Sequence, residues 1–501
     1  MQVKITELKT RLAEIFDLDM AGSLLGWDQQ VNLPPGGAAG RGRQSALLAR
    51  LSLERSSDPA LGCLLDELQP YAESLPYDSD EASLVRVARR EFERAIRIPP
   101  EFMSEYYQHS ALCYQAWTEA RPAGDFKKVE PFLERTLYMS RLMETFFPGY
   151  EHIADPLIDF SDYGMKAASV RALFTELRAG LVPLVQAITD CPPVDDTCLH
   201  RHFPRQSQWD FGIEVIRDLG YDFNRGRQDF APHPFTTKFG LGDVRITTRI
   251  DEDYLADALF STIHEAGHAM YEQGIRMNLE GTPLASGTSA GVHESQSRLW
   301  ENIVGRSLPF WRHYYPRLQA IFPVLADISL ENFYRAINKV QRSLVRVDAD
   351  EVTYNLHVML RFDLELELLE GKLAVRDLPE AWRSRFAQDL GITPPDDRLG
   401  VLQDVHWYGG VIGGSFQGYT IGNILSALWY QAALQAHPQI PAEMEEGRFG
   451  TLHGWLVENI YQHGRKFTAT ELVQRVTGGP MRIEPYLAYL REKYNSMYGL
   501  V

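Results

Sequence analysis

Helical periodicity runs through almost the whole sequence and constrains the fold more than any other feature. Convincing β alternation is scarce, and its clearest case runs from Asp243 to Arg249. No repeat, low-complexity tract or long linker marks a boundary, so we expect residues 1–501 to form one composite domain, or two interleaved helical lobes around a cleft. The sequence predicts a mainly α protein with a small sheet. The clearest helical segments cover residues 81–97, 130–147, 167–188, 352–369, 419–435, 451–462 and 483–494.

Bulk composition excludes several classes of protein. The chain has 501 residues, a formal net charge of -17 and 45% hydrophobic residues, enough for a large core. The acidic balance and the lack of a basic run disfavour nucleic acid and anionic membranes as partners. The amino terminus is a charged amphipathic helix without a cleavage site, and no later stretch approaches the ~18 apolar residues of a membrane span. With four scattered cysteines, the pattern indicates a cytoplasmic protein.

The motif HEAGH places His264 and His268 four residues apart, with Glu265 directly after the first. On a helix the two imidazoles share one face and can hold a divalent metal, while Glu265 projects beside them to deprotonate a bound water. A chance match on an ordinary helix is the alternative, but an apolar stripe through the segment argues against it. Acidic residues 251–253 are candidate caps, and Gly274 stands where a C′ glycine is expected. The pattern is typical of zinc-type metallohydrolases.

A catalytic zinc site uses three protein ligands, so a third donor is expected near the motif. Glu294 is the best candidate, because it heads a second predicted helix that the turn-rich loop 278–291 can fold back against the first. His293 is the rival ligand, and its other interpretations are to support a ligand or to face the substrate. Arg298, four residues after Glu294, is placed to orient that carboxylate. We expect a His, His, Glu site with an open fourth position for water.

The stretch from Gly400 to Trp407 gathers an acid, an amide, an imidazole and an indole before a glycine-rich turn. A hydrolase of this type must hold the carbonyl oxygen as it becomes an oxyanion. We interpret His406 and Tyr419 as the donors to that oxygen or to the substrate. The alternative is that His406 packs in the core and Tyr419 merely opens a helix.

Three further side chains are candidates for substrate binding. His233 precedes a proline that holds the backbone extended, which leaves the ring to face a cleft or to serve as a structural histidine. Arg245 on the predicted strand and Arg346 are candidates for a carboxylate clamp, because arginine offers a bidentate fork. Each arginine has an ordinary alternative as a structural ion pair, Arg346 with Asp348, Asp350 or a helix neighbour.

Six blocks of the sequence resemble the carboxypeptidase Taq family of thermostable-type metallocarboxypeptidases. They occur in the family's order, and the segment from Leu24 to Gly37 is similar to the family's opening, so the likeness covers nearly the whole chain. One departure follows Trp407, where many relatives carry a GYFP-type turn and this chain reads YGGVIGGSFQGY, ending at Tyr419. The blocks are HPFTT at His233, DVRITTR at Asp243, HEAGH at His264, HESQS at His293, VRVDAD at Val345 and GVLQDVHW at Gly400.

The resemblance implies a mostly helical fold like that of angiotensin-converting enzyme and neurolysin. A deep active-site cleft with the metal at its floor and a homodimer as the usual assembly are further implications. The implied activity removes single residues from the carboxyl ends of peptide substrates with broad specificity, and carboxyl-terminal proline is resisted. One divalent metal per subunit, zinc or cobalt, is the implied cofactor.

The resemblance also implies a role for each matching position. The implied roles are His264, His268 and Glu294 as metal ligands, Glu265 as general base and then proton donor, His233, His406 and Tyr419 as groups that polarise the carbonyl or hold the substrate, and Arg346 as the cation that limits substrate length or holds the terminal carboxylate, with Arg245 as its competitor.

Two other interpretations remain open. Within enzymes, the histidine motif with a distal glutamate also fits an oligoendopeptidase or a dipeptidyl carboxypeptidase, which internal cleavage of amidated peptides would favour. In a different class, the chain is a catalytically idle, metal-bound binding protein, although the intact Glu265 argues against it.

Overall fold

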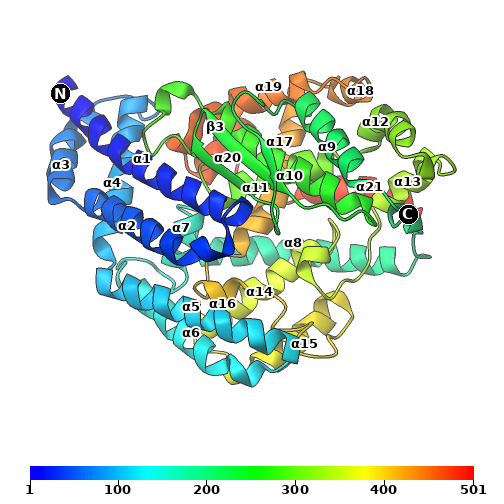
Figure 1. Ribbon diagram of the computed structural model, residues 1–501, viewed down its shortest axis with the longest axis horizontal. Coiled ribbons are helices and arrows are strands. Elements are labelled where there is room, and N and C mark those ends of the chain that lie inside the picture. Colours follow the sequence, from blue (N-terminus) through cyan, green and yellow to red (C-terminus); the bar gives the residue numbers. More distant parts are fainter. Residues whose placement is uncertain (501) are drawn as a thin grey trace.

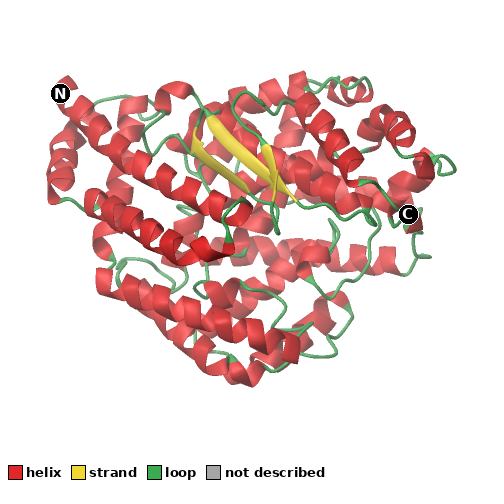
Figure 2. Ribbon diagram, viewed as in Figure 1, coloured by secondary structure: helices red, strands yellow, loops and turns green. Residues whose placement is uncertain are grey.

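The chain folds into a mainly helical body in which one small sheet is embedded (Figure 1). The computed structural model describes residues 1–500 of the 501-residue chain. Figure 2 shows the strands as a small group among helices. The prediction of a mainly α protein with a small sheet is therefore confirmed.

The helices before the sheet begin with a long hairpin of α1 and α2, which lie side by side (Figure 1). The helices predicted at 81–97, 130–147 and 167–188 are confirmed as α4, α6 and α8, with ends within two residues of the prediction. The helices of this part are α1 (Gln2–Val31), α2 (Ala38–Ser56), α3 (Pro59–Glu73), α4 (Asp80–Arg97), α5 (Pro100–Ala123), α6 (Glu130–Thr145), α7 (Asp155–Ser161), α8 (Ala167–Thr189) and α9 (Arg205–Leu219), with short 3-10 turns η1 (Pro35–Gly37), η2 (Phe126–Lys128) and η3 (Thr197–Leu199).

The sheet has three strands in the order β1-β3-β2. The central strand β3 (Asp243–Thr248) is the predicted one, and it pairs in parallel with β1 (Gln228–Phe230) and antiparallel with β2 (Thr236–Gly240). The flanking strands were not predicted, because three and five residues are too few to show alternation. Register places Thr236 opposite Ile246 and Thr237 opposite Arg245, so neighbouring side chains face opposite sides of the sheet.

The helices after the sheet carry most of the core. The predicted helices at 352–369, 419–435 and 483–494 are confirmed, whereas the helix predicted at 451–462 ends at Asn459, because Ile460 leaves the helical conformation with φ -127°. The elements are α10 (Leu255–Gly274), α11 (Ala290–Arg298), the π-helix η5 (Leu299–Val304), α12 (Leu308–Ile321), α13 (Leu330–Ile337), α14 (Tyr354–Leu369), α15 (Leu378–Leu390), α16 (His406–Gly409), α17 (Gln417–Ala436), α18 (Ile440–Glu445), α19 (Gly450–Asn459), α20 (Ala469–Thr477) and α21 (Glu484–Tyr498), with 3-10 segments η4 (Met277–Leu279), η6 (Pro323–Leu325), η7 (Arg346–Asp348), η8 (Val375–Asp377) and η9 (Tyr461–Lys466).

Two buried cores hold these elements together. The larger core begins at Phe102 and takes in most of the later helices, including the buried faces of α10, α14 and α17. The smaller core joins α1, α3 and α4 to the segment from Ile275 to Ala285. Helix α2 has no buried residue, so it rests on the smaller core without entering it.

Glycines let two helices approach α11 closely. A Cβ atom on Gly267 of α10 would lie 2.7 Å from the carbonyl oxygen of Gln296, and one on Gly422 of α17 would lie 2.6 Å from Cγ of Glu294. A side chain at either position would displace the backbone or side chain of α11. Helix α11 is thus held between α10 and α17, with Glu294 at the contact.

Helix α10 differs from the expected boundaries at both ends. Its N-cap is Tyr254, which makes no side-chain cap, because Asp251 instead accepts from the N–H of Asp253 in the preceding turn. Gly274 lies inside the helix, and the C-cap Ile275 is extended. The cap and C′ predictions are therefore wrong. Gly274 serves packing, since a Cβ there would lie 2.6 Å from Cβ of Tyr461.

Candidate metal centre

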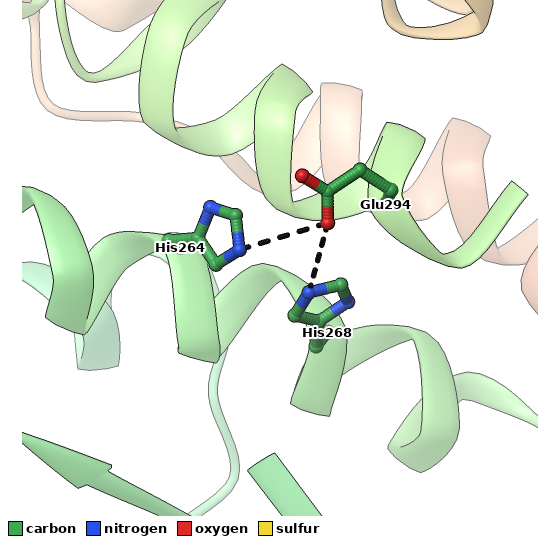
Figure 3. A group of neighbouring side chains, drawn as sticks. All are labelled: His264, His268 and Glu294. Atoms are coloured by element: carbon green, nitrogen blue, oxygen red, sulfur yellow. Dashed lines mark ion pairs between the residues drawn. The ribbon is translucent and has the colours of Figure 1, made fainter. Parts of the chain in front are cut away.

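Three side chains from two helices converge on one point. His264 and His268 project from successive turns of α10, and Glu294 reaches them from α11 (Figure 3). The Oε2 atom of Glu294 lies 3.7 Å from Nε2 of His264 and 3.4 Å from Nε2 of His268. One ligand atom from each residue lies within 4.8 Å of the other two, so the group can hold a metal ion.

The donor set and its spacing fit a divalent metal. Tetrahedral sites with bonds of about 2.0–2.1 Å separate their donor atoms by about 3.4 Å, close to the two separations that Glu294 makes here. Two imidazole nitrogens and one carboxylate oxygen are the donors of many catalytic zinc sites, and they leave a fourth position open. The side chains of the group are 9–18% exposed, so small molecules can reach it.

A carboxylate and a guanidinium hold the first histidine and the glutamate in place. Glu301 accepts from Nδ1–H of His264 at 2.9 Å, which leaves Nε2 of that ring unprotonated and facing Glu294. Arg298 donates to Glu294 at 2.7 Å, the contact expected from their spacing, and to Glu301 at 3.2 Å. Glu301 lies in the π-helix η5 and was not predicted. The sequence feature that could have identified Glu301 is its spacing from Glu294 and Arg298, because steps of four and three residues place all three on one helical face.

The second histidine, His268, is supported by a series of hydrogen-bonded side chains. Nδ1 of His268 lies 2.6 Å from Nδ1 of His293, and Nε2 of His293 lies 2.8 Å from Glu272. Glu272 also accepts from Lys238 at 2.6 Å, which ties the chain to β2. His293 therefore points at His268 and Glu272. Glu272 was not predicted, although it follows His268 by four residues on the same helical face.

The carboxyls of the site differ in their protonation. Burial acts to raise the pKa of Glu294, but the charge of Arg298 and the contacts with His264 and His268 together outweigh burial and hold that pKa well below its usual range. Burial likewise acts to raise the pKa of Glu301, but Arg298, His264 and Arg306 together lower that pKa to about 2. At Glu265 burial prevails and raises the pKa. The site thus keeps Glu294 as an anionic donor and makes Glu265 a stronger base than an exposed glutamate.

Glu265 lies beside the group, and β2 holds it. The hydroxyl of Thr236 donates to Oε2 of Glu265 at 2.6 Å, because the register of β2 turns this side chain towards α10. Oε1 of Glu265 makes no hydrogen bond to residues 1–500 and remains available as a proton acceptor. Thr236 had no assigned role in the sequence, where it is part of the HPFTT block.

His406 and Tyr419 lie together. Nε2 of His406 is 3.1 Å from the Tyr419 hydroxyl, and Nδ1 donates to Asp404 at 2.5 Å. With Nδ1 protonated, Nε2 accepts from the Tyr419 hydroxyl. The Tyr419 ring packs edge-on to Tyr354, whose other neighbour is Arg298, with its guanidinium 4.5 Å above the ring. This packing joins the pair to the metal-ligand group.

Arg346 is buried against the same carboxylate as His406. Its Nε donates to Asp404 at 2.6 Å and its Nη1 donates to the Tyr354 hydroxyl at 3.0 Å. Arg361, fully buried, adds a third contact to Asp404 at 2.9 Å. The partner of Arg346 is therefore Asp404, which was not predicted, although it stands two residues before His406.

The last two substrate-binding candidates, His233 and Arg245, differ in where they lie relative to the metal-ligand group. His233 is exposed in the loop before β2, and partial burial of its ring, then the charges of Arg249 and Arg346, lower its pKa, so it lies within electrostatic range of Arg346. Arg245 pairs with Asp243 at 2.7 Å and stacks 4.5 Å above Trp27 of α1. Its side chain faces the side of the sheet opposite Thr236, so the structure does not bring it to the group.

The helical fold and the convergent His, His, Glu group define a metallopeptidase. The model of the carboxypeptidase Taq (M32) metallopeptidase family matches residues 7–494, and the chain belongs to this family. Thermostable carboxypeptidase 1 of Thermus thermophilus is 42% identical over 488 residues, covering 95% of this chain and 96% of that protein. Carboxypeptidase 1 of Bacillus subtilis is 36% identical over 506 residues, covering 99% of this chain and all of that protein.

A solved structure agrees with this assignment. The M32 carboxypeptidase from Deinococcus radiodurans R1 is 51% identical, and it matches 99% of this chain and 100% of its own length with a TM-score of 0.97. The protein is therefore a metallocarboxypeptidase that acts on peptides, and membership of a metallopeptidase family implies a divalent metal. Among the helices of residues 1–500, none has the length and apolar character to cross a membrane.

Proposed function

We propose that this metallocarboxypeptidase releases single residues from free carboxyl ends with broad specificity. Its metal is held by His264, His268 and Glu294, and Glu265 is the general base. The observation that supports the proposal is the spacing of the three donor atoms, with Oε2 of Glu294 3.4–3.7 Å from both imidazoles and the base on the adjoining residue.

Zinc is the proposed metal, with cobalt as a substitute, because two imidazoles and one carboxylate suit both. A bound divalent metal supplies Lewis acidity, which lowers the pKa of water and polarises a carbonyl. Arg298 and Glu301 hold the donor atoms in place, and the low pKa of Glu294 keeps that ligand deprotonated. The rest of the chemistry falls to the neighbouring side chains.

Glu265 takes the proton that water loses as its oxygen attacks the last peptide carbonyl, and it then gives that proton to the departing amine. Thr236 holds Oε2, so the proton is carried on Oε1. Tyr419 donates to the carbonyl oxygen as it becomes an oxyanion, and His406 donates to it from Nε2 in its imidazolium form, with Nδ1–H still held by Asp404. For this, the Tyr419 hydroxyl turns from Nε2 of His406 to the substrate, and Asp404 keeps the ring oriented.

Arg346 supplies positive charge near the end of the peptide, and His233 lies within electrostatic range of it. Nε and Nη2 of Arg346 already donate to the two carboxylate oxygens of Asp404. We therefore propose that Arg346 attracts the terminal carboxylate of the peptide at long range or through one hydrogen bond, and not through a bidentate pair. Carboxyl-terminal proline is disfavoured because its ring fixes φ and leaves the scissile nitrogen without an N–H. A cytoplasmic homodimer is the proposed assembly.

The test is mass spectrometry of a mixed peptide set incubated with the metal-reconstituted protein, the chelated protein and Glu265→Gln. Stepwise loss of single residues from free carboxyl ends, abolished by chelator and by the substitution, supports the proposal. Internal cuts in amidated peptides, or release of dipeptides, would move the assignment to an oligoendopeptidase or a dipeptidyl carboxypeptidase. Metal retention without any hydrolysis would indicate an idle binding protein.

A further inference from the structure

A cavity that none of the three metal-ligand candidates lines lies between α4 and the segment around α7. Its volume is about 560 Å³. The wall formed by α4 carries Arg86, Arg90, Arg94 and Arg97, which the helical repeat places on one face over a length of about 16 Å. The opposite face of the same helix is buried in the smaller core. The protein is acidic as a whole, with a net charge of -17, so this arginine stripe stands apart from the rest.

Aromatic rings support the guanidinium groups of the stripe. The guanidinium of Arg86 lies 3.8 Å above the ring of Tyr77, and that of Arg90 lies 4.0 Å above the ring of Tyr163. Arg94 lies 5.2 Å above Phe160 in the same manner. Stacking covers the faces of the guanidinium planes and fixes them, but it leaves their N–H edges able to donate. The stripe is therefore a preorganised row of donors.

The carboxylates of the cavity do not neutralise the row. Arg94 pairs with Asp159 at 3.0 Å, and Arg97 lies 3.8 Å from Glu93. Arg86 forms no ion pair within residues 1–500, and its Nη1 donates to the carbonyl oxygen of Tyr77 while its Nη2 donates to the Ser83 hydroxyl and to the carbonyl oxygen of Lys466.

Arg90 is the second arginine with donors to spare. It donates only its Nε to Glu91, so across residues 1–500 its two terminal nitrogens make no hydrogen bond. Glu91 is in turn shared with Arg94 and Arg465. Positive charge thus remains at Arg86 and Arg90, and the unused terminal donors lie mainly on Arg90.

We propose that this arginine stripe binds an acidic peptide segment in extended conformation. Arginines four residues apart on a helix repeat about every 6 Å. An extended peptide repeats the side chains of one face about every 6.7 Å, so alternating Glu or Asp residues match Arg86, Arg90 and Arg94 in register. A single small oxyanion is too small to contact all three arginines at once. Single-stranded nucleic acid is the poorer fit, because base stacking needs aromatic faces and arginines already cover these rings.

Binding by this stripe does not depend on catalysis, so it can be measured separately. The probe is acetyl-(Glu-Ser)₃-amide, whose blocked carboxyl end removes the group that a carboxypeptidase recognises, and acetyl-(Gln-Ser)₃-amide is the matched neutral peptide. Titration calorimetry on the metal-reconstituted protein is expected to show at least tenfold tighter binding of the Glu peptide at low salt. The difference should shrink as salt rises, because exposed charges are screened.

Substitutions locate the binding. Arg90→Gln and Arg86→Gln should each weaken binding of the Glu peptide about tenfold, whereas Arg376→Gln, at a side chain 72% exposed on η8, should leave it unchanged. Unaltered cleavage of a neutral reference peptide shows that each variant is folded. Equal binding of the two peptides, no effect of either stripe substitution, or tighter binding of a single-stranded oligonucleotide overturns the proposal.

Discussion

His268 and His293 face each other through their Nδ1 atoms at 2.6 Å. With Nε2 of His268 as the proposed metal donor, that nitrogen carries no hydrogen, so Nδ1 carries it and His293 accepts it. The other nitrogen of His293 must then carry its own hydrogen, which it donates to Glu272 at 2.8 Å. The hydrogen bonds from His268 through His293 and Glu272 to Lys238 thus fix one tautomer of each histidine. His293 acts on the metal site through His268.

Replacing His293 should weaken metal binding. His293→Ala leaves Nδ1–H of His268 without an acceptor, and loss of such a support costs 10–100-fold in metal affinity. Competition with a chelating dye measures this change. His293→Gln supplies an amide oxygen for His268 and an amide N–H for Glu272, so it should recover part of the affinity. Equal affinities for wild type and His293→Ala would show that the contact does not position the ligand.

Glu265→Gln should separate metal binding from turnover. The amide cannot accept a proton from water, so kcat should fall about 10²–10⁴-fold, whereas metal content stays within twofold of wild type. The amide N–H₂ can still hydrogen-bond to Thr236, which preserves the local structure. Single-turnover rates on metal-saturated protein give the comparison. A variant with most of the original rate would assign the base to another residue.

Gly422→Ala should disturb the metal centre through packing alone. The added Cβ would meet Cγ of Glu294 at 2.6 Å, so α11 or the carboxylate must move. We expect a loss of about 1–3 kcal/mol in unfolding free energy together with weaker metal binding. Gly454→Ala in α19 is the matched control, because no atom lies within 4 Å of its Cβ position, and it should raise stability by about 0.5–1 kcal/mol. Unchanged metal affinity in Gly422→Ala would mean that α11 yields without moving Glu294.

The sequence alone was enough to predict those features of the fold and site that local residue spacing determines. Long helices such as α8 and α14 appeared as apolar periodicity, and the four-residue step from His264 to His268 already placed two donors on one face. Glu294 could be named because a turn-rich loop requires the next helix to fold back. Metal identity, assembly and the roles of single site residues remain proposals.

The contacts that the sequence did not reveal join distant segments. Asp404 gathers Arg346 and Arg361 from elements more than 40 residues away, and nothing in the local pattern around Arg346 favours it over Asp348 or Asp350. The same holds for Arg245, whose stacking on Trp27 depends on where α1 crosses the sheet. Tertiary packing decides such pairs, so periodicity and motif spacing cannot predict them.

Glu365 gives a prediction for the dependence of stability on pH. Its carboxyl is completely buried in α14 and accepts from the indole of Trp407 at 2.8 Å. Burial raises its pKa from 4.5 to about 8, so the folded protein keeps it protonated at neutral pH while the unfolded chain ionises it above 4.5. The stabilisation from the proton is complete below pH 4.5, falls steadily as pH rises above 4.5, and is gone once pH has risen through 8.

Glu365→Gln removes this titration and keeps an acceptor for Trp407. Between pH 5 and pH 8 the wild-type protein should lose stability relative to the variant by about 1.4 kcal/mol per pH unit, on the order of 4 kcal/mol in all. Urea unfolding of both proteins at several pH values gives the difference, in which the other titrating groups and the metal cancel. A difference independent of pH would show that Glu365 is ionised in the folded protein. In that case its charge must be balanced by Arg361, whose charge opposes the rise in the Glu365 pKa.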